Sequence, residues 1–177
     1  CFRCRNDGLN NSEFAISPAN IEASNVITVA ATYNNEVLAS FSNFGDKVQV
    51  AAPGVLIDSA IPGTETVKLS GTSQAAPQVA YLAARLLTIR PELNPKEVKN
   101  IIVQTVDKLD FLQGKVSSNG AVNFERAEMA AELSRHFSIK RAIEISFTRV
   151  KTVVSKKGSS TKTFPKIMPV QLAPQFY

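Results

Sequence analysis

The sequence predicts an α/β domain, and three observations lead to that prediction. Residues 25–32 and 48–51 are short apolar runs with β-branched side chains and polar flanks, which is typical of buried strands. Residues 72–90 are rich in Ala and Leu and repeat apolar positions at spacings of three and four, which indicates a long, largely buried helix. Strands followed by helices of this length favour the α/β class.

The remaining elements follow from local signals along the chain. Residues 55–61 are expected to form a third strand, ended by a Pro-Gly turn, and Pro91 ends the long helix. Asn94 starts a second helix, because it can cap the first turn while Glu97 completes a capping box. Asn123 is expected to cap a third helix that runs to about residue 135.

Charge divides the chain into two predicted parts. Residues 1–134 carry 11 Lys and Arg against 14 Asp and Glu, whereas residues 135–177 carry 9 against 1. Within the second part, residues 139–154 alternate apolar and polar positions and predict a strand, residues 155–162 predict a loop, and the end is rich in Pro. Residues 135–177 are therefore expected to be a basic tail, or the start of an appended β-rich domain.

Several partners and site types are not predicted. The basic residues are spread over the tail without a nucleic-acid-binding signature, so no nucleic acid is expected as a partner. No apolar run reaches the roughly 18 residues that a membrane-spanning helix needs. Cys1, Cys4 and His136 are too few for a zinc site, and two cysteines cannot build a disulfide framework, so the redox compartment stays open.

Ser73 is the candidate nucleophile of the chain. It follows Gly-Thr at the start of the predicted helix, where unpaired backbone N–H groups and the positive end of the helix dipole could stabilise an oxyanion. Pro77 keeps Ser73 in the first turn, because proline is tolerated only near a helix start. The alternative is an ordinary helix-capping serine.

The segment around Ser73 resembles the nucleophile motif of the subtilisin-like serine proteases, the subtilases or peptidase S8 family. Four further segments resemble motifs of that family and stand in the family's order, so that the resemblance covers residues 5–134. They are a strand at residues 25–31, a Phe-Ser-Asn-x-Gly-like loop at 39–45, a strand with an Ala-Pro-Gly turn at 48–57, and a Gly-x-Val-Asn-like helix start at 119–127.

The resemblance implies a fold and two site residues. The fold would be three-layered, a parallel sheet flanked by helices, and incomplete at its N-terminal side. Ser73 would be the nucleophile, and Asn6 would be the side-chain donor of the oxyanion hole together with the Ser73 N–H. Arg5 stands where the family has Gly, and Gln78 where it usually has His. Without the family pattern, Asn6 belongs to an Asn-Asp-Gly turn.

The resemblance also places the triad Asp and His upstream of Asn6, and neither family segment occurs in these 177 residues. The chain by itself is therefore expected to be nearly inert, with the missing N-terminal portion of the same domain as its partner and a polypeptide as substrate. A hydrolase that uses Ser73, then Asp107 or Asp110, then His136 is an alternative order. A non-catalytic pseudoenzyme or binding scaffold is another.

Further expectations come from the family. Catalysis would require no cofactor. Structural calcium is common in the family, but no ligand set in this sequence identifies a calcium site. An extracellular or secreted location is expected by resemblance.

Overall fold

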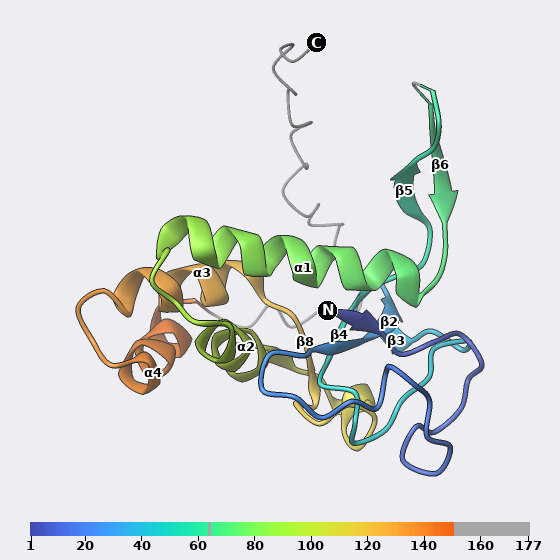
Figure 1. The fold of residues 1–177 in the computed structure, drawn as a ribbon, viewed down its shortest axis with the longest axis horizontal. Coiled ribbons are helices and arrows are strands. Elements are labelled where there is room, and N and C mark those ends of the chain that lie inside the picture. The colour runs from blue at the N-terminus through green and yellow to red at the C-terminus, as the bar shows by residue number, and fades with distance from the viewer. Residues whose placement is uncertain (64, 151–177) are drawn as a thin grey trace.

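The structure is a computed structural model that describes residues 1–63 and 65–150 (Figure 1). Its centre is a sheet in the order β1-β2-β4-β8-β7, with β3 paired to β2. The neighbours among β1, β2, β4 and β8 are parallel, and the pairs β2–β3 and β7–β8 are antiparallel. The strands are β1 (Phe2–Arg3), β2 (Thr28–Tyr33), β3 (Val37–Leu38), β4 (Val50–Pro53), β7 (Asp107–Lys108) and β8 (Gly120–Ala121).

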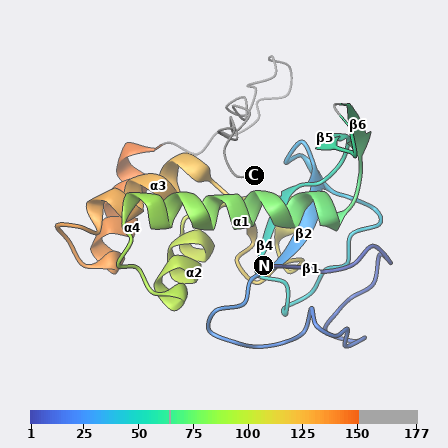
Figure 2. The ribbon, with the colours of Figure 1, turned by 45° about the horizontal axis from the view of Figure 1, so that its top comes forward.

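The helices pack mainly on one face of this sheet, and α1 lies across it in both views (Figures 1 and 2). Side chains alternate along β2, so that Val29 and Ala31 join the core beneath the helices while Ala30 faces the other side. Within the described residues, the short helix η1 and its neighbours cover that second face through Leu112. The predicted α/β class is confirmed. The helices are α1 (Thr72–Ile89), α2 (Pro95–Gln104), η1 (Asp110–Leu112), α3 (Phe124–Leu133) and α4 (Ile139–Arg149).

Both predicted helix caps are confirmed. The Asn94 side chain accepts a hydrogen bond from the Glu97 N–H at 3.0 Å, and the Glu97 carboxylate accepts one from the Asn94 N–H at 2.9 Å. Asn123 accepts from the Arg126 N–H at 2.8 Å and starts α3. These helices begin where the sequence indicates because a cap needs only residues three positions apart.

The predicted strand over residues 139–154 is wrong for its described part, since Ile139–Arg149 form helix α4. The Ser138 side chain caps this helix, and Ala142 and Ser146 are buried one turn apart against the rest of the molecule. Because this helix buries small residues, its larger apolar residues are not confined to one helix face. They alternate with polar residues along the sequence, and that alternation resembles the pattern of a strand. The division at residue 134 stays a prediction, and residues 151–177 lie outside the described residues.

A two-stranded hairpin projects from the body beside the start of α1 (Figure 1). It pairs β5 (Ile57–Ala60) with β6 (Thr66–Leu69) in antiparallel register. The strand predicted at residues 55–61 is thus present as β5, whereas β6 was not predicted. The side chains of β6 are largely exposed, so the strand lacks the buried face by which a strand is predicted from sequence.

In the described ranges, 1–63 and 65–150, no helix combines the length and the apolar character that crossing a bilayer requires.

Candidate active site

The turn before α1 positions Ser73 by direct contact between backbones. The Gly71 N–H donates to the Gly54 carbonyl at 2.7 Å, which ties the start of α1 to the end of β4. A Cβ on Gly54 would lie 2.6 Å from the Ala31 Cβ and 2.8 Å from the Gly71 oxygen. Only glycine allows this approach, so the Ala-Pro-Gly turn fixes where α1 begins and places the half-buried Ser73 in its first turn.

Gln78 adds a second tie between α1 and β4. Its side-chain Nε2 donates to the Pro53 carbonyl at 2.5 Å and to the Gln74 carbonyl at 3.0 Å. The departure from the family pattern at Gln78 therefore supplies a structural link near the first turns of the helix.

Asn6 reaches the same helix start from the opposite end of the sequence. Its Oδ1 accepts from the Thr72 backbone N–H at 3.0 Å and from the Thr72 hydroxyl at 2.7 Å. With Oδ1 held by Thr72, the amide is oriented, and Nδ2 lies 3.1 Å from the position of a Cβ on Gly71. The structure thus brings together Asn6 and Ser73, the two site residues that the sequence predicts.

Two hydrogen-bond donors remain unused beside Ser73. Among the bonds of the described residues, the Thr72 N–H goes to Asn6 and the Gln74 N–H goes to Gly71. In that part of the chain, no bond is donated by the Ser73 N–H or by Asn6 Nδ2. A pair of free donors at the positive end of a helix is suited to binding a developing oxyanion.

The sequence did not predict that Asn43 holds the turn containing Asn6. Asn43 is fully buried, its N–H donates to the Arg5 carbonyl at 3.0 Å, and its Oδ1 accepts from the Asp7 and Leu9 N–H groups at 2.8 and 3.2 Å. Its Nδ2 donates to Asn11. The available signal was the Phe-Ser-Asn loop at residues 41–43, where a buried Asn must satisfy every polar group it carries.

Arg5 adopts a backbone conformation that suits glycine. Its φ is 82°, in the left-handed region where a side chain is disfavoured. The turn therefore keeps the geometry that a Gly would supply, and the Arg5 guanidinium lies 3.5 Å from the Asp7 carboxylate at the exposed surface.

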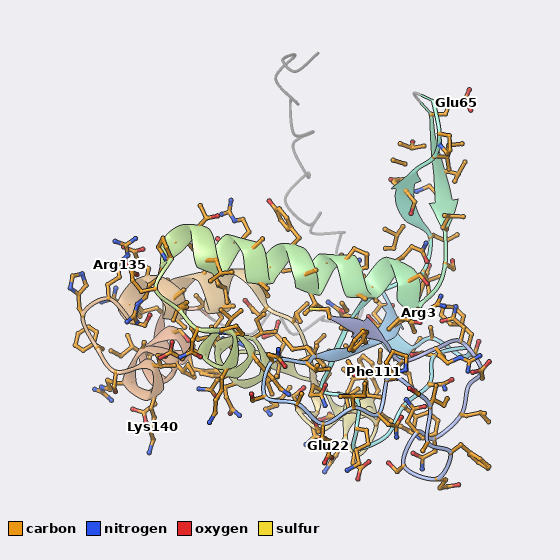
Figure 3. The ribbon with its side chains drawn as sticks, in the orientation of Figure 1. Arg3, Glu22, Glu65, Phe111, Arg135 and Lys140 are labelled. Atoms are coloured by element: carbon orange, nitrogen blue, oxygen red, sulfur yellow. The ribbon has the colours of Figure 1, made fainter. Side chains whose placement is uncertain are left out.

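Arg3 makes an unforeseen contact with the candidate nucleophile. Its Nη1 donates to Ser73 Oγ at 2.7 Å across 70 positions of sequence. Figure 3 places Arg3 by the N-terminal end of α1. The contact was invisible in the sequence because only the parallel pairing of β1 with β2 carries Arg3 to this helix.

The alternative order of Ser73, then Asp107 or Asp110, then His136 is wrong, because His136 lies far from Ser73. Arg135, the neighbour of His136, donates to the Ile89 carbonyl at the far end of α1 (Figure 3). At 1.5 Å per residue, that end is about 24 Å from Ser73. Asp107 is engaged with Arg126, whose Nη1 lies 2.9 Å from its Oδ1. His136 therefore cannot serve as the base for Ser73.

The two cysteines lie in opposite environments. Cys1 is exposed, whereas Cys4 is buried and its Sγ donates to the Asn43 carbonyl at 3.0 Å. Burial raises the pKa of Cys4 from its ordinary value of 9.0 to about 11, although a hydrogen bond with Ser42 partly opposes this. Over residues 1–63 and 65–150, no group of three or more His, Cys, Asp or Glu side chains is arranged to hold a metal ion.

We expect stability to fall as the pH rises above 9. The unfolded chain releases the Cys4 proton near pH 9.0, whereas the folded chain keeps it to about pH 11. The folded state thus binds more protons in this window, and unfolding becomes easier by about 1.4 kcal/mol per pH unit. Urea titrations between pH 8 and 11 measure this slope. A Cys4→Ala variant should lack it, and an equal slope in both proteins would exclude Cys4 as the cause.

Comparisons with known proteins agree with one another. Residues 6–124 match the peptidase S8 family, described as the subtilase family. The chain is 43% identical over 122 residues to a thermophilic serine proteinase of Bacillus sp. (strain AK1), covering 66% of this chain and 29% of that protein. It is 38% identical over 125 residues to subtilisin DY of Bacillus licheniformis, covering 69% of this chain and 43% of that protein. The chain therefore spans less than half the length of these relatives.

A solved structure extends the similarity to more of the fold. A chain from a structure titled for the assembly of the subtilase cytotoxin SubAB superposes with a TM-score of 0.63 at 27% identity, covering 85% of this chain and 50% of that one.

Proposed function

The chain belongs to the subtilase family of peptidases, and we propose that it forms the C-terminal portion of the catalytic domain of a serine endopeptidase. In this proposal Ser73 Oγ attacks the carbonyl carbon of a peptide bond, the amine leaves, and water hydrolyses the acyl-enzyme. The observation that carries it is a pair of donors at the start of α1, the Ser73 N–H and Asn6 Nδ2, which donate no bond within residues 1–63 and 65–150.

The two donors account for stabilisation of the tetrahedral intermediate. As the carbonyl oxygen becomes negative, both can donate to it, and the helix dipole adds to the field at the same point. The Thr72 bonds hold the Asn6 amide before substrate arrives, so little reorganisation is needed.

The proton of Ser73 requires a base, and Arg3 cannot be that base. A guanidinium carries hydrogen-bond donors and no acceptor, so Arg3 donates to a lone pair of Oγ and leaves the hydroxyl proton free. We place the triad His and Asp in sequence upstream of Asn6 in the same protein. Without a base, the 177 residues alone would be nearly inert, as known from a subtilisin of this same family.

The remaining parts of the proposal follow the family. The substrate is a polypeptide, the location is extracellular, and the hydrolysis as written consumes only peptide and water. The described residues do not fit a carboxylate-rich calcium site, and no step is assigned to an ion.

A fluorophosphonate probe tests the proposal on the full-length protein. We expect covalent labelling of Ser73, found by mass spectrometry of the labelled peptide, and its loss in Ser73→Ala. The matched control is Ser70→Ala, because Ser70 lies three residues earlier and its hydroxyl accepts a bond from the Leu56 N–H next to the hairpin. Its labelling should be unchanged.

The second candidate function is a non-catalytic subtilase-like scaffold, favoured by the Arg3 contact with Ser73 and by Arg5 at the glycine position. Folded full-length protein that the probe leaves unlabelled would support it. So would upstream sequence without Asp-Thr/Ser-Gly and His-Gly-Thr segments.

A further inference from the structure

A cavity lined by two arginines opens beside the candidate nucleophile. Its volume is about 400 Å³, and its lining comes from β1, the turn that follows, and the loop before β2. The lining residues are Phe2, Arg3, Arg5, Ser17, Pro18 and Ala19. Both charges on this wall are positive, and the lining contains no carboxylate.

The cavity adjoins the reacting groups. Arg3 lines it and also donates to Ser73 Oγ at 2.7 Å. A smaller hollow of about 170 Å³ shares Arg3 and Arg5 and adds Asn6 and Asp7 to its lining. The short segment that carries the oxyanion donor Asn6 therefore also builds the wall of the cavity.

The charges are only partly balanced. Arg5 is 3.5 Å from Asp7, but Asp7 lines the smaller hollow and not the larger cavity. Arg3 has a neutral hydroxyl as its partner. A carboxylate would be a stronger partner than a hydroxyl, because hydrogen bonds between ionised groups are shorter and stronger than neutral ones. Phe2 and Pro18 offer apolar surface to the methylene groups of an incoming side chain.

We propose that this cavity selects a glutamate or aspartate side chain at the substrate residue that donates the scissile carbonyl. The inference rests on the proposed function. The proposal names this substrate residue because its carbonyl oxygen would meet Asn6. Arg5 directly precedes Asn6, and Arg3 lies three positions before it on the same segment. When the substrate carboxylate accepts a hydrogen bond from the Arg3 guanidinium, Arg3 no longer donates to Ser73 Oγ. The Oγ lone pair that accepted that bond becomes free.

Fluorogenic peptides that differ only at this residue test the proposal on the full-length protein. We expect kcat/KM for Glu to exceed that for the isosteric Gln about tenfold, which corresponds to about 1.4 kcal/mol. The ratio should fall as salt is added, because both arginines are exposed. Hydrolysis of Gln or Leu peptides at rates equal to or above that of Glu would overturn the specificity and leave the peptidase function standing.

Variants assign the preference to the cavity. Arg3→Ala together with Arg5→Ala should bring the Glu/Gln ratio to about one, Arg3→Lys should retain most of it, and Arg3→Glu should favour a Lys peptide. The matched control is Arg141→Ala, which removes an exposed arginine of α4 that pairs with Glu144. An undiminished ratio in the double variant would overturn the assignment.

A binding measurement separates the two proposals if Ser73 is not labelled by the fluorophosphonate probe. The proposed peptidase function would then fail, but fluorescence anisotropy with the uncleaved Glu and Gln peptides would still report on the cavity. About tenfold tighter binding of the Glu peptide supports an acid-selective pocket, and equal binding overturns it.

Discussion

We expect replacement of Asn6 with Ala to lower kcat of the full-length protein by about 10²–10³-fold and to leave KM nearly unchanged. The expected size is that measured for the equivalent oxyanion donor of a subtilisin, a member of this same family. In the proposed mechanism Nδ2 donates to the oxyanion, which exists only after attack, so its loss should affect the transition state and not the bound substrate. Steady-state kinetics with a fluorogenic peptide measure both constants.

Asn6→Asp isolates the donor from the structural role of the same side chain. The aspartate keeps an oxygen that can accept the Thr72 bonds but has no N–H, so the helix start should be retained while kcat falls. Asn25→Ala is the control, because Asn25 is an exposed residue of the loop before β2. Unchanged kcat in Asn6→Ala would show that Asn6 does not bind the oxyanion.

We expect Asn43→Ala to lower the free energy of unfolding by about 3 kcal/mol. The substitution leaves the buried Asn11 Oδ1 without the bond that Asn43 donates, and an unsatisfied buried polar group costs about 1–3 kcal/mol. It also removes the acceptor of the partly buried bonds from the Asp7 and Leu9 N–H groups. Because these bonds fix the turn around Asn6, kcat should fall as well. Urea unfolding at constant m-value measures the first effect, and peptide hydrolysis under native conditions measures the second.

Asn34→Ala serves as the comparison for Asn43→Ala, since Asn34 is exposed in the turn between β2 and β3. The φ of Asn34 is 48°, so an alanine there adds only local strain in the left-handed region. We expect kcat to stay unchanged. Equal losses of stability and kcat in both variants would contradict a special role for Asn43.

Features with local causes could be predicted from the sequence. The long helix was found because its apolar period and Pro91 act over one or two turns, and the Asn94 cap because its partner is three residues away. Ser73 was found because its motif is contiguous. Helix α4 was missed because burial against α3, and not its own apolar pattern, decides its structure.

Contacts between distant segments could not be predicted. The bond from Arg3 to Ser73 depends on the pairing of β1 with β2. The support that Asn43 gives to the turn around Asn6 depends on hydrogen bonds between segments more than 30 positions apart. Neither contact can be predicted from residue types and their spacing in the sequence. The resemblance to the family places Asn6 and Ser73 in one site. It implies no role for Arg3 or Arg5, whose positions beside that site come from the three-dimensional arrangement.

Helix α4 determines how short a stable form of this protein can be. Arg126 is fully buried in α3, and its guanidinium donates to the Val150 carbonyl and stacks on the Phe147 ring at 4.3 Å. A chain that ends at residue 134 would lose both contacts, and the Arg126 guanidinium would be exposed to water where they were. A truncated form for expression should therefore extend through Val150, sixteen residues beyond the part that resembles the family.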